Sequence, residues 1–231
     1  MAFGFHGKVL HINLTKNEIT TETPPSEFYR QYMGGGALGG YYLLKHMDPT
    51  IDALDPKSVM VFAPSIITGT PIPGSSRYSI VAKSPLGGAI GESQAGGYWG
   101  AELKRAGFDA VVVTGKANKP VYIAINNEDV SICPADNVWG LDTGDAQDKI
   151  REELGDKRVR IVQIGPAGEN VVRIAGIVNE LRHFHGRCGL GAVMGSKNLK
   201  AIAVRGRGTV EVADKDKVRE MAREFASTFT S

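Results

Sequence analysis

The sequence has few cysteines and no long apolar segment. Its two cysteines, Cys133 and Cys188, lie far apart and do not have the spacing of a metal-binding knuckle. No apolar run approaches the roughly 20 residues of a transmembrane helix, and the first residues, MAFGFHGKVLHINL, lack the apolar core of a signal peptide. We therefore expect a cytoplasmic protein without a membrane partner, where reducing conditions disfavour a disulfide bond.

A strong net charge and the common catalytic motifs are also missing. The formal net charge is +2, which gives no reason to expect nucleic acid as a partner. The chain has no zinc-type cluster, no G-x-S-x-G elbow and no Walker loop. Carboxylate pairs such as Glu152-Glu153 fall on helices predicted to be exposed, where they are ordinarily solvated. No proton-transfer residue can be assigned from the sequence.

Glycine is abundant instead. The chain has 29 glycines, roughly 1.8 times the usual share of about 7%. They cluster, notably at residues 34–36, 87–97 and 186–195, so they mark loops and close backbone approaches instead of a disordered linker. The triple glycine at 34–36 fits either a phosphate cradle or a simple helix–helix junction.

The richest of these clusters is the stretch 182–200, RHFHGRCGLGAVMGSKNLK. Glycines at close spacing let backbone N–H groups approach a phosphate, and the neighbouring basic residues supply countercharge. The same pattern fits a tight turn that enters a short helix at 190–196, with the basic residues in solvent. His183 and His185 are two residues apart, a spacing more often structural than metal-binding.

Two further features could bind an anion. The irregular segment TGTPIPGSS (68–76) delivers Arg77 to the start of a predicted strand, where its planar fork could meet two acceptors, although most arginines are simply exposed. Gly96 and Gly97 precede a predicted helix at 98–106, whose N-terminus offers free N–H groups and a positive dipole end.

Hydrophobic periodicity and turn residues predict a mixed α and β domain. Strands are predicted at 8–14, 18–22, 59–63, 78–82, 110–114, 120–125, 129–132, 159–164, 171–178 and 201–204. Helices are predicted at 27–32, capped by Ser26, and at 37–47, 98–106, 143–154, 190–196 and 214–229. The sequence stops within the last helix without a capping signal, so we expect a piece of a longer chain.

Four segments together resemble a known family. They are RYSIVAKSPLGG, GGYWGAELKRAGFDAVVVTGKANKPVYI, IGPAGENVVRIAGIVN and GRCGLGAVMGSKNLKAIAV. In this order they resemble the N-terminal domain of the tungsten-dependent aldehyde:ferredoxin oxidoreductases, and the similarity covers nearly the whole chain. The resemblance implies an α+β fold of two pseudo-symmetric β-sheets with flanking helices, forming a saddle for a bis-pyranopterin tungsten or molybdenum cofactor.

The resemblance also implies domains and partners. Residues 1–210 would be the cofactor-cradling domain, and residues 211–231 would start a helix that leads into missing downstream domains. Those domains would bind a [4Fe–4S] cluster. The complete protein would oxidise aldehydes to carboxylic acids and pass electrons to ferredoxin or an electron-transfer subunit. A homodimer is one possible assembly, and the piece alone is expected to be inactive.

Site residues carry over position by position from the resemblance. Arg77 would bridge pterin and cluster, and the backbone carbonyls of Gln94 and Phe184 would bind a magnesium ion between the two pterin phosphates. Asparagine is usual where Gln94 stands, and the usual R-A-A-G-R-G-G reads H-F-H-G-R-C-G here. The full predicted cofactor-binding set is Arg77, Gln94, Ala95, Gly96, Gly97, His183, Phe184, His185, Gly186, Arg187, Cys188, Gly189 and Gly191.

Two other functions stay open on the sequence. The HFHGRC departure fits a relative that reduces another substrate, such as an aromatic acyl-CoA. Glycine loops and basic residues alone would also permit a non-redox phosphate- or nucleotide-binding module. Cys188 either tunes the cofactor or is an inert small residue in the turn.

Overall fold

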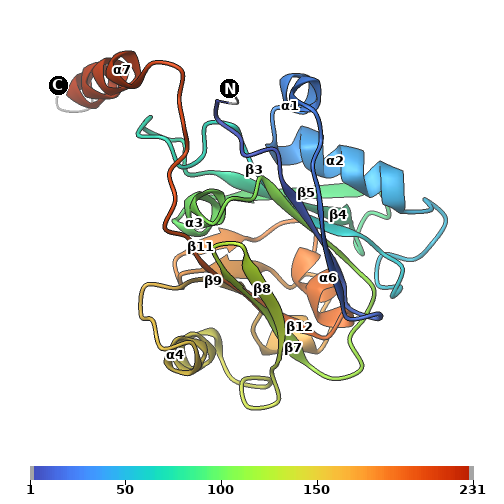
Figure 1. Cartoon of the computed structure of the whole chain (residues 1–231). Helices are drawn as coiled ribbons and strands as arrows, with labels where there is room; N and C mark the ends of the chain where they lie inside the picture. Colours follow the sequence, from blue (N-terminus) through green and yellow to red (C-terminus); the bar gives the residue numbers. More distant parts are fainter. Residues whose placement is uncertain (1–2, 229–231) are drawn as a thin grey trace.

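In the computed structural model, residues 3–228 are described, and these residues form two six-stranded sheets with flanking helices (Figure 1). The first sheet has the order β2-β1-β6-β3-β4-β5, with β1 (Val9–Asn13), β2 (Glu18–Glu22), β3 (Met60–Pro64), β4 (Tyr78–Lys83), β5 (Ile90–Ala95) and β6 (Ala110–Thr114). The second has the order β11-β10-β9-β12-β7-β8, with β7 (Val121–Asn126), β8 (Asp129–Pro134), β9 (Arg160–Gln163), β10 (Ile177–Asn179), β11 (His183–His185) and β12 (Leu199–Arg205).

The two sheets repeat one topology. In each, an N-terminal hairpin (β1–β2 and β7–β8) pairs in parallel with the last strand of its half, β6 or β12. The remaining neighbours are antiparallel, and each sheet ends at the fifth strand of its half, β5 or β11. The predicted pair of pseudo-symmetric sheets is confirmed.

Helices cover the outer faces of the sheets and also lie between them. The helices are α1 (Ser26–Tyr32), α2 (Gly35–His46), α3 (Trp99–Arg105), α4 (Thr143–Glu153), α5 (Pro166–Glu169), α6 (Leu190–Ser196) and α7 (Lys215–Thr228). Apolar residues of α1 and α2 pack on the outer face of the first sheet, and those of α4 pack on the outer face of the second. The largest core joins the inner faces of both sheets with α3 and α6 (Figure 1).

Strand β6 shows why a continuous apolar run forms a central strand. Val111 and Val113 face the inner core, whereas Ala110 and Val112 pack on the outer side beneath α2. Side chains of a strand alternate between its faces, so a strand covered on both sides must be apolar at every position. The run AVVVT meets this requirement and was predicted correctly as 110–114.

A buried carboxylate fixes the start of the chain. Asp109 accepts hydrogen bonds from the N–H groups of His6 (2.9 Å), Gly7 (2.8 Å) and Lys8 (3.2 Å), and it pairs with the buried Lys104 of α3. Because every acceptor site of the carboxylate is used, its charge can stay inside the protein. The first residues are thereby held beside β6 and α3.

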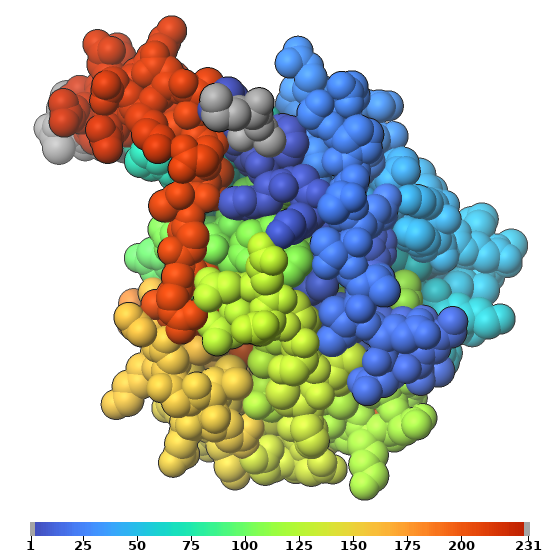
Figure 2. Space-filling model, viewed as in Figure 1, coloured from blue at the N-terminus to red at the C-terminus, as the bar shows by residue number. Residues whose placement is uncertain are grey.

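The C-terminal helix lies apart from the two sheets. In the space-filling view, α7 projects from the body and joins it through a narrow stretch of chain (Figure 2). The predicted helix at 214–229 is confirmed over 215–228, and its last predicted residue lies outside the described residues. The domain boundary at 210/211 stays a prediction. Among residues 3–228, no helix is both long enough and apolar enough to cross a bilayer.

Some local predictions were wrong. Residues 171–178 do not form one strand: a helical turn, α5, ends at Glu169, Val171 has a positive φ of 56°, and only 177–179 pair as β10. Ser26 does not cap α1, because Pro25 occupies the cap position and no side chain bonds there. The glycine-rich segment 87–97 contains strand β5, and 183–185 form strand β11.

Candidate functional site

An open concavity of about 710 Å³ lies where the two sheets meet. It is lined by Arg77, Glu92, Ser93, Gln94, Phe184, Gly186 and Arg187. Arg77 directly precedes β4, while the others come from β5, β11 and the loop after β11. Three segments that are distant in the sequence therefore contribute to one surface.

Edge strands β5 and β11 meet beneath this concavity, and we call their junction the β5–β11 seam. His185 Nδ1 lies 2.8 Å from the carbonyl oxygen of Ser93, and the N–H of Arg187 donates to Ser93 Oγ at 3.3 Å. Asn179 of β10 donates to the carbonyl of Gly96 at 3.1 Å. These bonds partly replace the ladder that an edge strand otherwise lacks, and they set the spacing of the two sheets.

The alternation of β5 decides which of its side chains reach the concavity. Its exposed positions are Ile90, Glu92 and Gln94, and the intervening residues are buried. Glu92 is held in place, since its Oε1 accepts hydrogen bonds from Ser79 Oγ (2.6 Å) and Gln94 Nε2 (2.8 Å). Glu92 was not among the site residues predicted from the sequence, although the alternation of small and polar residues in GESQA was a signal that could have revealed it.

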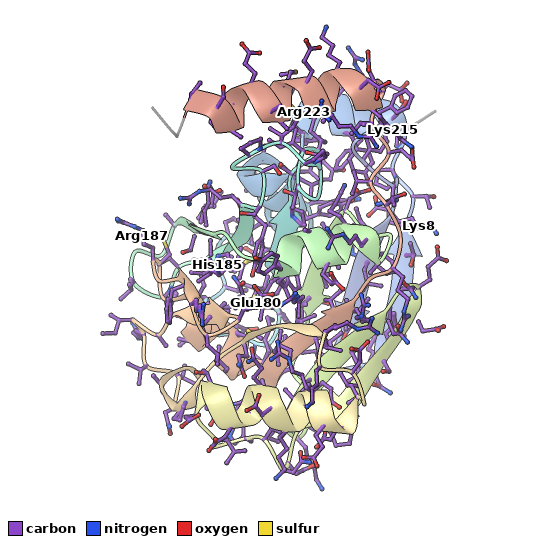
Figure 3. The ribbon with its side chains drawn as sticks, turned by 90° about the vertical axis from the view of Figure 1, so that its left-hand side faces the viewer. Lys8, Glu180, His185, Arg187, Lys215 and Arg223 are labelled. Carbon is purple, nitrogen blue, oxygen red and sulfur yellow. The ribbon has the colours of Figure 1, made fainter. Side chains whose placement is uncertain are left out.

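Strand β11 places its neighbouring residues Phe184 and His185 in opposite surroundings. Phe184 is exposed over the concavity, whereas His185 is fully buried and packs edge-on against the Tyr78 ring, with ring centroids 4.6 Å apart. Burial lowers the pKa of His185 to about 4, so the imidazole is neutral at pH 7. Figure 3 shows Arg187 extending outward at the edge of the molecule, while His185 lies closer to its centre. His185 thus supports the seam from below.

The predicted glycines serve close packing within the protein. A Cβ on Gly97, whose φ is 94°, would come within 2.3 Å of Asn179 Oδ1. A Cβ on Gly189 would lie 1.9 Å from the carbonyl oxygen of Arg173, and one on Gly191 would lie 2.4 Å from that of Gly176. Gly189 and Gly191 are buried, so the structure places them behind the concavity and not on its wall.

The start of α3 is not an open anion site. Glu180 Oε2 accepts a hydrogen bond of 2.8 Å from the N–H of Tyr98, at the N-terminal end of that helix. Burial raises the pKa of Glu180, and the N–H donor of Tyr98 works against that rise. At least one of the N–H groups predicted to be free is therefore already paired with the protein's own carboxylate.

The two lysines of the stretch 182–200 are structural. Lys197 is buried and donates to the carbonyls of Ser58 (2.6 Å) and Gly115 (3.1 Å). Lys200 is buried, pairs with Glu169 and donates to the Leu141 carbonyl at 2.9 Å. Both side chains therefore anchor the chain around β12 instead of supplying countercharge to the concavity.

The two cysteines do not form a disulfide bond with each other. Both cysteines are free thiols. Cys188 has a positive φ of 64°, packs against the central core and places its Sγ 3.5 Å from the Glu92 carbonyl oxygen, which favours a packing role. Within residues 3–228, no group of three or more His, Cys, Asp or Glu side chains is placed to hold a metal ion.

Comparison with known proteins identifies relatives over almost the whole chain. The family model "Aldehyde ferredoxin oxidoreductase, N-terminal domain" matches residues 9–206. The chain is 51% identical over 222 residues to the tungsten-containing aldehyde ferredoxin oxidoreductase of Pyrococcus horikoshii, covering 96% of this chain and 37% of that protein. It is 34% identical to the WOR-like subunit of an aliphatic sulfonate oxidoreductase of Pyrococcus furiosus, covering 96% of this chain and 38% of that protein.

A solved structure has the same fold. It is the active site complex BamBC of benzoyl coenzyme A reductase in complex with 1,5-dienoyl-CoA, with a TM-score of 0.95 and 33% sequence identity. The match covers 98% of this chain and 35% of that one. The chain thus spans little more than a third of the length of these relatives.

Proposed function

The chain belongs to the aldehyde ferredoxin oxidoreductase family and corresponds to the N-terminal domain of its members. We therefore propose that it is the tungstopterin-binding part of an aldehyde-oxidising enzyme. The observation that carries the proposal is the concavity over the β5–β11 seam. There Arg77, Gln94 and the Phe184–Arg187 segment face one space, in a chain that matches this family over residues 9–206.

The residues of the concavity suit a phosphate-bearing cofactor. Arg77 and Arg187 are both exposed, and each guanidinium can donate paired hydrogen bonds to anionic oxygens. Gln94 and Phe184 lie on edge strands, where backbone carbonyls can face away from the sheet ladder. Mg²⁺ prefers such oxygen ligands together with phosphates. The fit supports the bis-pyranopterin and the magnesium ion as cofactors.

In this proposal the chain binds and orients while the cofactor reacts. When bound, the tungsten pterin supplies the redox chemistry, in which an aldehyde and water give a carboxylic acid, two protons and two electrons. Arg77 and Arg187 would stabilise the negative charge of the cofactor. The carbonyls of Gln94 and Phe184 would hold magnesium, and the buried residues of the seam, such as His185, would keep both strands at a fixed spacing.

The other components of the enzyme are proposals as well. The relatives are far longer than this chain, so a [4Fe–4S] cluster would be bound by residues outside it, and ferredoxin would take the electrons. A homodimer and a cytoplasmic location stay predictions.

A second reaction has a specific observation in its favour. The structural match at a TM-score of 0.95 is to a benzoyl coenzyme A reductase complex. Reduction of an aromatic acyl-CoA is therefore the alternative. Aldehyde oxidation is preferred because the aldehyde ferredoxin oxidoreductase of Pyrococcus horikoshii shares 51% identity with this chain, against 33% for the reductase complex.

Anaerobic purification of the complete native gene product tests both reactions. We expect tungsten or molybdenum in a fixed ratio to protein, and aldehyde-dependent reduction of ferredoxin or a viologen dye. Turnover of an aromatic acyl-CoA without aldehyde oxidation would favour the alternative. Protein that contains neither metal would rule out both enzymes and leave a simple phosphate-binding module.

A further inference from the structure

Glu92 is a carboxylate in the concavity that has no role in the function proposed above. It lies on the exposed face of β5, two residues before Gln94, and it lines the same space as Arg77 and Arg187. Neither the resemblance nor the predicted site includes it. A carboxylate is unexpected in a site for a phosphate-bearing cofactor, because like charges repel at short distance.

The position of Glu92 is fixed by its neighbours. Ser79 Oγ and Gln94 Nε2 both donate to Oε1, at 2.6 Å and 2.8 Å. The first turn of α2 also crowds the carboxylate, since a Cβ on Gly36 would lie 2.5 Å from both of its oxygens. The N-terminal end of a helix favours a negative charge nearby. The described residues form no hydrogen bond to Oε2, so this oxygen is available to a ligand.

A divalent cation bound between them would offset the repulsion between the fixed carboxylate of Glu92 and the phosphates. Mg²⁺ is commonly bound by one or two protein carboxylates together with phosphate oxygens, and it takes the rest of its ligands from water and carbonyls. Gln94, whose backbone carbonyl is a proposed magnesium ligand, is also the residue whose side chain holds Glu92. We propose that Glu92 supplies a carboxylate oxygen to the divalent cation that joins the pterin phosphates, an inference that rests on the proposed function.

Cation affinity of the cofactor-loaded protein tests this role directly. The complete native gene product is purified anaerobically as wild type, Glu92→Gln, Ser79→Ala and Glu152→Gln, the last altering an exposed carboxylate of α4. Each protein is dialysed against EDTA and titrated with Mn²⁺, while the free ion is followed by electron paramagnetic resonance. Tungsten content and unfolding temperature are measured on the same samples.

We expect Glu92→Gln to bind Mn²⁺ on the order of 10- to 100-fold more weakly than wild type, with unchanged tungsten content and unfolding temperature. Ser79→Ala should weaken binding by a smaller factor, because it frees the carboxylate without removing it. Glu152→Gln should behave as wild type. If Glu92→Gln fails to load tungsten, Glu92→Asp should load it and bind Mn²⁺ less tightly than wild type.

Two results would overturn the inference. One is wild-type Mn²⁺ affinity in Glu92→Gln, or in Glu92→Asp where only that variant loads. The other is a loss of tungsten with an unchanged ratio of Mn²⁺ to the remaining tungsten, which would place Glu92 on an N–H group of the pterin. Failure of the proposed function is recognised separately, by the absence of tungsten and molybdenum from the wild-type protein.

Discussion

Arg77 shows how a single side chain can be positioned by an irregular loop. Its carbonyl accepts a hydrogen bond of 3.0 Å from Thr68 Oγ1, so the first and last residues of the segment 68–77 before β4 are bonded to each other. Its guanidinium is exposed and lines the concavity. The sequence predicted this placement from the proline and glycine content of residues 68–76. It could not show what Arg77 faces, because β5 and β11 depend on pairing between distant segments.

We predict that Arg77→Gln lowers cofactor occupancy or turnover by about 10- to 100-fold, because hydrogen bonds to charged groups contribute about 1.5–3 kcal/mol. Tungsten content and aldehyde-dependent dye reduction of the complete enzyme are the measurements. Arg30→Gln, which alters an exposed arginine of α1, is the matched control and should leave both unchanged. Equal occupancy and rate in Arg77→Gln and wild type would contradict the role.

His185 predicts a pH dependence of stability. Its folded-state pKa, about 4, is below its ordinary value of 6.5, so the unfolded chain binds more protons between these pH values. Stability from this group is present above pH 6.5 and is lost as the pH falls toward 4, by about 3 kcal/mol in total. His185→Asn should remove this part of the pH dependence in urea unfolding of the 231-residue chain.

Ser93→Ala is the control for that experiment. It keeps His185 and the backbone carbonyl beside His185 Nδ1, so its unfolding free energy should follow the wild-type pH dependence. A wild-type slope in His185→Asn between pH 4.5 and 6.5 would show that another group is responsible.

At the scale of elements, helices and strands that are specified by their own residues could be predicted from the sequence. Strands that depend on pairing with distant segments could not. The apolar runs of β3 and β6 and the amphipathic helix α4 were found because their own residues specify them. Strand β5 reads GESQA after Ile90, with small and polar residues and no β-branched run, so only its pairing with β4 makes it a strand. Strand β11 has three residues and exists through β10. Glu92 was missed for the same reason.

The contact between α5 and α6 gives a prediction at this scale. A Cβ on Gly195 would lie 1.9 Å from the backbone oxygen of Gly168, which cannot move without shifting α5. Gly195→Ala should therefore lower the free energy of unfolding by about 2–3 kcal/mol. Gly40→Ala on α2 is the control, because no atom lies within 4 Å of the added Cβ, and it should raise stability by about 0.5–1 kcal/mol. Urea titration measures both, and a neutral Gly195→Ala would contradict the packing argument.

At the scale of the whole molecule, the two sheets share one core. The central cluster joins inner residues of the first sheet, such as Phe62 and Val111, with inner residues of the second, such as Ile123 and Ile202. Trp99 of α3 crosses between them, since its indole N–H donates to the Ile202 carbonyl at 2.9 Å. Neither sheet can bury its inner face alone.

We therefore predict that the two halves unfold together. In a Trp139→Phe background, the fluorescence of Trp99 and the far-ultraviolet circular dichroism should report one coincident transition in urea. Two separated transitions, with Trp99 changing in only one of them, would show that the halves are independent despite their common core.

The β5–β11 seam also has a consequence for how the protein resists self-association. An unpaired strand edge is a template onto which a strand from another molecule can add. The seam hides one such edge of each sheet and leaves β2 and β8 at the outside. These outer strands carry Glu18 and Glu22 in one case, and Asp129 and Pro134 in the other. Charge and proline discourage strand addition at these outer strands, and the junction that shapes the concavity removes the other edge of each sheet.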